Sequence, residues 1–171
     1  MANELIAIRT ILDRLVADEE SEELGTAFRN VKTTNSFVVM GVAEAGTAIK
    51  KNFISLADSI SPDLDLDGMT CGKMTNREII LASRYAYRQL ALSVHHTFAK
   101  KAVNFTINNL SVKGLTERAK EIMRIVWWCD TQIKDIVKDI LENPEDEDGN
   151  YTSSFAGSVV EMKIIGDTVI Y

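Results

Sequence analysis

Cysteine and proline are both scarce in this sequence. The only two cysteines, Cys71 and Cys129, form no CxxC motif and no disulfide framework, which is typical of reduced thiols in a cytosolic protein. The only two prolines are Pro62 and Pro144, and no stretch is rich in Gly, Ser or Gln. We therefore expect no disordered linker between domains, and one ordinary hydrophobic core for the 171 residues.

Long apolar runs are also missing. The longest, FVVMGVA at 37–43, is far shorter than the about 20 residues that a membrane-spanning helix needs. Charged residues at positions 4, 9, 13 and 14 interrupt the N-terminal segment, which excludes the apolar core of a signal peptide. We expect a soluble, unexported protein with no membrane partner, in the cytoplasm or in a virion.

Motifs that carry catalysis or bind cofactors are not recognisable. The sequence has no GxxxxGK[ST] or GxGxxG loop and no nucleophile elbow. His95 and His96 are adjacent, so on a helix they point about 100° apart and cannot bind one metal together. We therefore expect no cofactor and no enzymatic activity.

One segment partly resembles a calcium-binding loop. Asp63, Asp65, Asp67 and Gly68 reproduce the first half of an EF-hand loop, in which alternate carboxylates converge on one cation. The twelfth position should supply a bidentate Glu, but it is Met74. An acidic connection between helices is the alternative interpretation, and we expect no useful calcium affinity.

Apolar residues recur at helical spacing over most of the chain. The pattern predicts helices at about 3–17, 36–60, 76–108 and 116–142, with a short amphipathic piece around 27–31. Thr75 and Glu78 form a capping box that fixes the start of the third of these four helices. Because apolar residues cover most of its circumference, this helix is predicted to lie at the centre of the fold.

Charge is distributed unevenly along the chain. Residues 76–141 carry eleven bases and six acids, a net charge of +5, whereas residues 142–171 carry one base and seven acids, a net charge of −6. We expect the acidic segment 145–148 to lie against the basic helical surface, and more readily that of a neighbouring chain than its own.

The last fifteen residues have a strand-like pattern. Val160, Met162 and Ile164 alternate with charged residues, a turn is predicted at 166–167, and Val169 follows it. Because an isolated hairpin is marginally stable in water, residues 157–171 are predicted to form an arm that packs on another surface.

Two features of the predicted helices point to partner binding. Arg77, Arg84, Arg88 and His95 fall within one narrow arc, so they form a basic ridge. The ridge is either a solvated face, with or without acids of a neighbouring element paired to it, or a site for an anion. Trp128 lies opposite the apolar stripe of its helix, with Trp127 at the edge between the two faces; Trp128 is either covered by its own chain or is an interface anchor.

These patterns together predict a mainly α protein of about four helices with a C-terminal β-hairpin. Residues 1–143 would form the helical domain, and residues 144–171 an acidic linker and arm. The favoured function is a structural subunit of a homo- or hetero-oligomeric assembly, by analogy a virion component such as a phage head-to-tail connector. A small acidic regulatory or inhibitor protein that binds a basic partner site is the alternative. Nucleic acid is a disfavoured partner because the chain is acidic overall.

Overall fold

The chain is mainly helical. A computed structural model describes residues 4–19, 22–31, 34–54, 65–66, 69, 71–105 and 112–145. Within these ranges lie five helices: α1 (Glu4–Ala17), α2 (Glu22–Arg29), α3 (Thr34–Ile49), α4 (Asn76–Phe105) and α5 (Val112–Glu142). The predicted hairpin at 157–171, with Val160, Met162, Ile164 and Val169, and most of the acidic linker lie outside the described residues.

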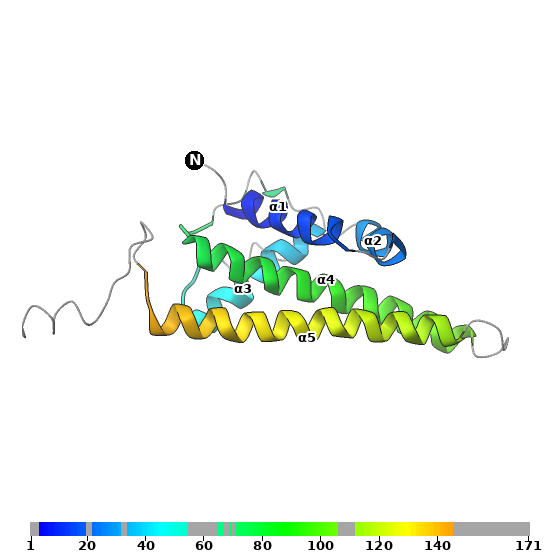
Figure 1. Cartoon of the computed structure of the whole chain (residues 1–171). Helices are drawn as coiled ribbons and strands as arrows, with labels where there is room; N and C mark the ends of the chain where they lie inside the picture. The colour runs from blue at the N-terminus through cyan, green and yellow to red at the C-terminus, as the bar shows by residue number, and fades with distance from the viewer. Residues whose placement is uncertain are drawn as a thin grey trace, which may run out of the picture.

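Helix α4 occupies the centre of the fold, as its sequence pattern predicts. It contacts all four other helices, with α1 and α2 on one side and α5 running alongside on the other (Figure 1). Seven of its apolar residues are almost completely buried: Leu81, Ala82, Ala86, Tyr87, Leu90, Ala91 and Val94. The two long helices α4 and α5 are antiparallel neighbours, so α5 presents one face to α4 and the opposite face outward.

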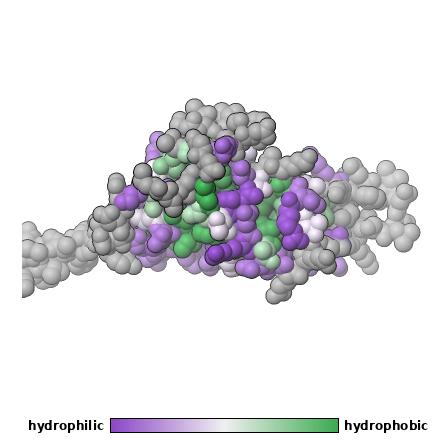
Figure 2. All heavy atoms as spheres, turned by 90° about the horizontal axis from the view of Figure 1, so that it is seen from above, coloured by the Kyte–Doolittle hydropathy of each residue, from purple (hydrophilic) through white to green (hydrophobic). Residues whose placement is uncertain are grey.

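The face formed by α1 and α2 is of mixed polarity. Figure 2 views the molecule from this side, and small hydrophobic areas lie there between larger hydrophilic ones. Exposed apolar side chains scattered in this way are normal for a protein surface.

The predicted capping box at the start of α4 is confirmed. The amide of Thr75 donates a hydrogen bond to Glu78 Oε2 (2.8 Å), and the amide of Glu78 donates to Thr75 Oγ1 (3.4 Å). Lys51 Nζ donates to the other Glu78 oxygen at 2.6 Å. The Glu78 carboxylate is 2% exposed, so these contacts replace the water that burial removes.

Small residues of α3 permit close packing on α4. A Cβ atom added to Gly41 would lie 2.5 Å from the carbonyl oxygen of Ala82 and 2.7 Å from the amide nitrogen of Ala86. Both atoms belong to the backbone of α4 and have little freedom to move. Gly41 therefore sets the distance between the two helices.

The predicted continuation of α3 to residue 60 is wrong, because the helix ends at Ile49. Lys50 adopts a left-handed conformation with φ of 59°, and the amide of Lys51 donates to the Gly46 carbonyl at 2.8 Å. This is the hydrogen bond of a Schellman motif. Gly46 makes the reversal possible, since a Cβ there would lie 2.5 Å from the Lys51 carbonyl oxygen.

Two smaller differences concern the other helices. The amphipathic piece around 27–31 belongs to a helix of its own, α2, so the described residues contain one helix more than the four predicted. Helix α5 begins at Val112, not at 116, and includes Gly114. A glycine destabilises a helix by only about 1 kcal/mol relative to alanine. The contacts of this 31-residue helix along α4 offset that loss.

Replacing Gly41 by alanine should destabilise the fold by about 1–3 kcal/mol, because the new methyl group overlaps two backbone atoms of α4. Gly25→Ala in α2 is the matched control: its Cβ would lie 3.5 Å from the nearest atom, a side-chain nitrogen of Arg29. That substitution should leave the free energy of unfolding unchanged or raise it, since alanine is the better helix former. Urea unfolding followed by circular dichroism measures both. Equal effects of the two substitutions would contradict the close packing at Gly41.

Candidate protein-interaction site

The basic ridge of α4 faces the polar margin of α5. Arg77 donates to Asp139 Oδ2 and to the Asn143 carbonyl oxygen, both at 2.5 Å, and its Nε lies 2.7 Å from a Glu145 oxygen. Arg88 Nε donates to Asp130 Oδ1 at 2.6 Å. Acids of a neighbouring element thus pair with two of the ridge arginines. That these arginines also bind a partner chain stays a prediction.

The contact between Arg77 and Glu145 also bears on the expected position of the acidic segment. Glu145 does lie against the basic helical surface, but that surface belongs to its own chain. The preference for a neighbouring chain is therefore wrong for Glu145, because the chain leaves α5 beside the first turn of α4 and Arg77 is within reach. Residues 146–148 lie outside the described part of the chain.

The third ridge arginine, Arg84, covers one face of Trp128. Its guanidinium carbon lies 4.7 Å from the ring centroid, a distance at which the ring attracts a cation. Burial lowers the pKa of Arg84. Two of its buried nitrogens, Nε and Nη1, make no hydrogen bond to any described residue. The indole therefore provides a large part of the environment of this charge.

Two tryptophans are exposed at the middle of α5. Trp127 is 63% exposed and Trp128 is 42% exposed. Trp127 is the middle residue of α5, because fifteen residues of the helix precede it and fifteen follow. Its own chain thus covers only part of Trp128, and an interface role for this residue stays a prediction. Helical spacing predicts Trp127 at the edge between the two faces of its helix, yet Trp127 is the more exposed of the two.

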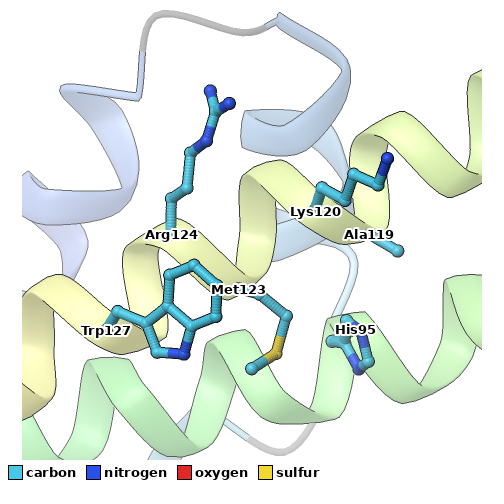
Figure 3. Close-up of a pocket in the computed structure, with 6 residues that line it drawn as sticks. All are labelled: His95, Ala119, Lys120, Met123, Arg124 and Trp127. Atoms are coloured by element: carbon cyan, nitrogen blue, oxygen red, sulfur yellow. The ribbon is translucent and has the colours of Figure 1, made fainter.

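A hollow lies beside each tryptophan. The hollow on the Trp127 side has a volume of about 440 Å³ and includes Met123, Lys120 and Arg124 of α5 and His95 of α4. In Figure 3 Met123 extends toward α4, where His95 lies, while Lys120 and Arg124 extend the other way. The fourth ridge residue, His95, thus belongs to a partly apolar recess and not to the ion pairs of Arg77 and Arg88.

The hollow on the Trp128 side is smaller, about 320 Å³, and includes Tyr87 of α4 together with Leu15, Asp18 and Glu19 at the end of α1. Arg124 lines both hollows. The outward surface of α5 around Trp127, Trp128 and Arg124 is therefore an aromatic centre between two recesses. Such a centre is typical of protein-binding surfaces, where tryptophan and arginine contribute most of the binding energy.

A polar contact joins α3 to α4 on another side of the fold. Gln89 of α4 donates a hydrogen bond to the Glu44 carboxylate of α3. Burial raises the pKa of Glu44, although the hydrogen bond from Gln89 and the positive charge of Arg88 both act to lower it. The contact fixes the position of α3 on α4, and we assign it a structural role.

The described residues give little indication of a reactive nucleophile or of a metal site. Burial raises the pKa of the Cys71 thiol to about 11 and that of Cys129 to about 12, which disfavours the reactive thiolate form. The part of the chain that the structure describes contains no cluster of three potential metal ligands. Of the three acids in the possible calcium loop, Asp65 alone is described, while Asp63 and Asp67 lie outside.

Comparisons with protein-family models, with curated protein sequences and with solved structures found no match. Among the described residues, no helix combines the length and the apolar character that crossing a membrane requires.

The ion pair of Asp139 should make stability depend on pH. Hydrogen bonds from Arg77 and Asn143 hold the pKa of Asp139 below its ordinary value, so this carboxylate stabilises the fold above the ordinary carboxyl range and loses that effect as the pH falls through the lowered pKa. We expect Asp139→Asn to destabilise the chain at pH 7 and the difference from wild type to shrink below about pH 4.

Asp13→Asn is the matched control, since Asp13 also pairs with an arginine, Arg9, but does so within the exposed surface of one helix. That pair should contribute at most about 0.5 kcal/mol. Urea unfolding of both variants at pH 7 and pH 3 makes the comparison. A loss for Asp139→Asn that is equally large at both pH values would rule out the assigned ion pair.

Proposed function

We propose that this chain is a structural subunit of a protein assembly and that the outward surface of α5 is where it binds other subunits. The observation that carries this proposal is the pair of tryptophans at the middle of α5, which are 63% and 42% exposed and lie beside two hollows. The other exposed large apolar side chains among the described residues, Leu141, Ile6, Ile80 and Met40, are distributed over three other helices and the end of α5.

Burial of Trp127 by a partner would be strongly favourable. An indole side chain has roughly 250 Å² of surface, so covering its exposed part removes about 150 Å² from water and contributes roughly 4 kcal/mol. The surrounding hollows offer space for side chains of the partner, and Lys120, Arg124 and His95 offer polar contacts at their margins. This combination of an aromatic anchor, a recess and a polar rim favours a protein partner over a small molecule.

The assembly role extends to the segment after α5. Residues 157–171 would act as an arm between subunits, with Val160, Met162, Ile164 and Val169 as its apolar contacts. Arg77, Arg84 and Arg88 would then add an indirect contribution by holding α5 and Glu145 in place on α4. A head-to-tail connector of a phage is one assembly of this kind, and it enters the proposal by analogy of architecture alone.

A regulatory or inhibitor protein is the alternative, because the chain has a net charge of −6 that suits a basic site on a partner. The two functions differ in self-association. An assembly subunit binds copies of itself or of a related subunit at raised concentration, whereas an inhibitor stays monomeric and titrates one partner.

Size-exclusion chromatography with light scattering tests the proposed role. The wild-type chain should show a mass above 19.0 kDa that rises with concentration, and Trp127→Ala should shift the mass toward that of the monomer, with circular dichroism and thermal stability unchanged. Ile6→Ala is the matched control, since Ile6 is 42% exposed on α1, and it should leave association unaltered. A wild-type chain that stays monomeric at every concentration, or a Trp127→Ala chain that associates normally, would contradict the proposed use of this surface.

A further inference from the structure

The charges on the outward face of α5 are sorted into two edges. At about 100° per residue, the buried residues Ile122, Val126, Cys129, Ile133 and Ile140 define the inward side of the helix. The outward line runs along α5 on the side opposite to these buried residues. Four acids lie about 30–70° from this line on one side and form the acidic edge: Glu117, Glu121, Asp135 and Asp139. On the other side, at about the same angles, lie three lysines, the basic edge: Lys120, Lys134 and Lys138.

Within one helix, the repulsions and attractions that this sorting creates largely offset each other. Like charges lie four residues apart at Glu117 and Glu121, at Lys134 and Lys138, and at Asp135 and Asp139, whereas opposite charges lie three residues apart at Glu117 and Lys120 and at Asp135 and Lys138. A helix face that only has to be soluble would gain from alternating signs at this spacing. The arrangement instead produces two stripes of opposite sign, each with a gap at the level of the tryptophans.

Most of these charges have no partner within the described chain. Among the seven residues of the two edges, the described part of the molecule pairs Asp139 with Arg77 and Lys138 with Glu142, the latter at 3.9 Å on an exposed surface. Glu117, Glu121, Asp135, Lys120 and Lys134 make no ion pair with any described residue. These five residues of the two edges thus have no ion pair within the described chain that a partner would have to displace.

The tryptophans lie between the stripes along the same face. Trp127 lies on the side of the basic edge and Trp128 on the side of the acidic edge, each about 50° from the outward line. The hollows confirm the two sides: one contains Trp127 with Lys120 and Met123, and the other contains Trp128 with Ile125. Arg124 lies close to the outward line and lines both.

On the basis of the assembly role proposed above, we infer that the partner of this face is a second copy of the same chain, with the two α5 helices parallel and the acidic edge of one against the basic edge of the other. Two identical helices that face each other and run in the same direction bring the left edge of one to the right edge of the other. In the antiparallel orientation the left edge of one helix lies against the left edge of the other, so acids would face acids and lysines would face lysines.

Self-complementarity is the reason for choosing a second copy over an unrelated protein. One helix face carries both signs, so the surface contains the two halves of its own contact. The antiparallel arrangement is disfavoured by the same charges that favour the parallel one, which gives the contact a defined orientation. In the parallel arrangement Trp127 of one copy also lies at the level of Trp128 of the other, since the two differ by one residue.

Charge reversal on one edge at a time tests the inference. In the parallel contact, Glu121→Lys with Asp135→Lys brings lysine against lysine at two levels of the helix, and Lys120→Glu with Lys134→Glu brings acid against acid at the same levels; all four positions are exposed. Each double variant should self-associate roughly tenfold or more weakly than wild type. A 1:1 mixture of the two variants should restore association, and so should the single chain that carries all four substitutions. Sedimentation equilibrium provides the dissociation constants, and Lys100→Glu on α4 serves as the control, with no expected change.

The outcomes separate this inference from the proposed function. If wild type associates through Trp127 but the variants neither weaken nor rescue association, the parallel contact with a second copy is wrong while the assembly role stands. If wild type never associates, both fail. Association that the single-edge variants weaken, and that the mixture and the four-substitution chain restore, supports the inference. The loss should also diminish in 1 M salt, where the screening length falls to about 3 Å.

Discussion

Burial of α4 on nearly every side is the constraint on which the rest of the structure depends. A 30-residue helix with apolar residues around most of its circumference is stable in water only if other elements cover it. Helix α3 covers one side at a distance that Gly41 sets, because no Cβ fits between it and the α4 backbone. Helices α1 and α2 cover a second side and α5 a third (Figure 1).

The burial of α4 also determines which residues form ion pairs and hydrogen bonds with its polar groups. A central helix has little water beside it, so its charged side chains need partners from the elements that cover it. Glu78 pairs with Lys51 and accepts a hydrogen bond from the Thr75 amide. Arg77 pairs with Asp139 and Glu145. Arg88 pairs with Asp130. Since α5 contributes Asp130 and Asp139 from its two flanks, its orientation about its own axis is fixed, and with it the residues that face outward.

The side of α5 that faces outward is therefore determined by the ion pairs that this helix makes with α4. The remaining charges are sorted into stripes of opposite sign, with two tryptophans at the middle of the helix. Both features add little to the stability of the isolated chain, since repulsion between like charges four residues apart offsets attraction between opposite charges three residues apart, and exposed indoles bury little surface. Both become favourable when a partner covers the face, which is the physical basis of the proposed assembly role.

Much of the helical architecture could be predicted from the sequence, because local signals dominate it. The capping box at Thr75 and Glu78 defined the start of α4, and its apolar pattern indicated a central position. The end of α3 was missed because a lysine, Lys50, occupies the left-handed position that usually belongs to glycine. Helical periodicity alone gives no warning of such a turn.

Sequence reasoning identified the polar face of α5 but not its organisation. The four-residue ridge on α4 was recognised, yet whether its arginines face solvent or the acids of α5 depends on the packing of two helices, which no local pattern specifies. Trp127 was judged an edge residue, although its angle from the buried stripe places it as far out as Trp128. At 100° per residue, the sequence alone shows that the acids and lysines of α5 are sorted into two edges. The sorting indicates a binding surface only when the structure shows which side of α5 is exposed.

Distances between spin labels on two associated chains test the central claim most directly. Labels would be attached at Thr131→Cys or at Glu142→Cys, in a chain whose native cysteines are replaced by alanine, and measured by pulsed electron paramagnetic resonance. Parallel α5 helices in contact at an interaxial distance of about 10 Å predict short distances, below about 25 Å with the label arms, at both positions. A short distance at 131 together with one of about 45 Å at 142, the separation expected for antiparallel helices crossing at Trp127, would contradict the account.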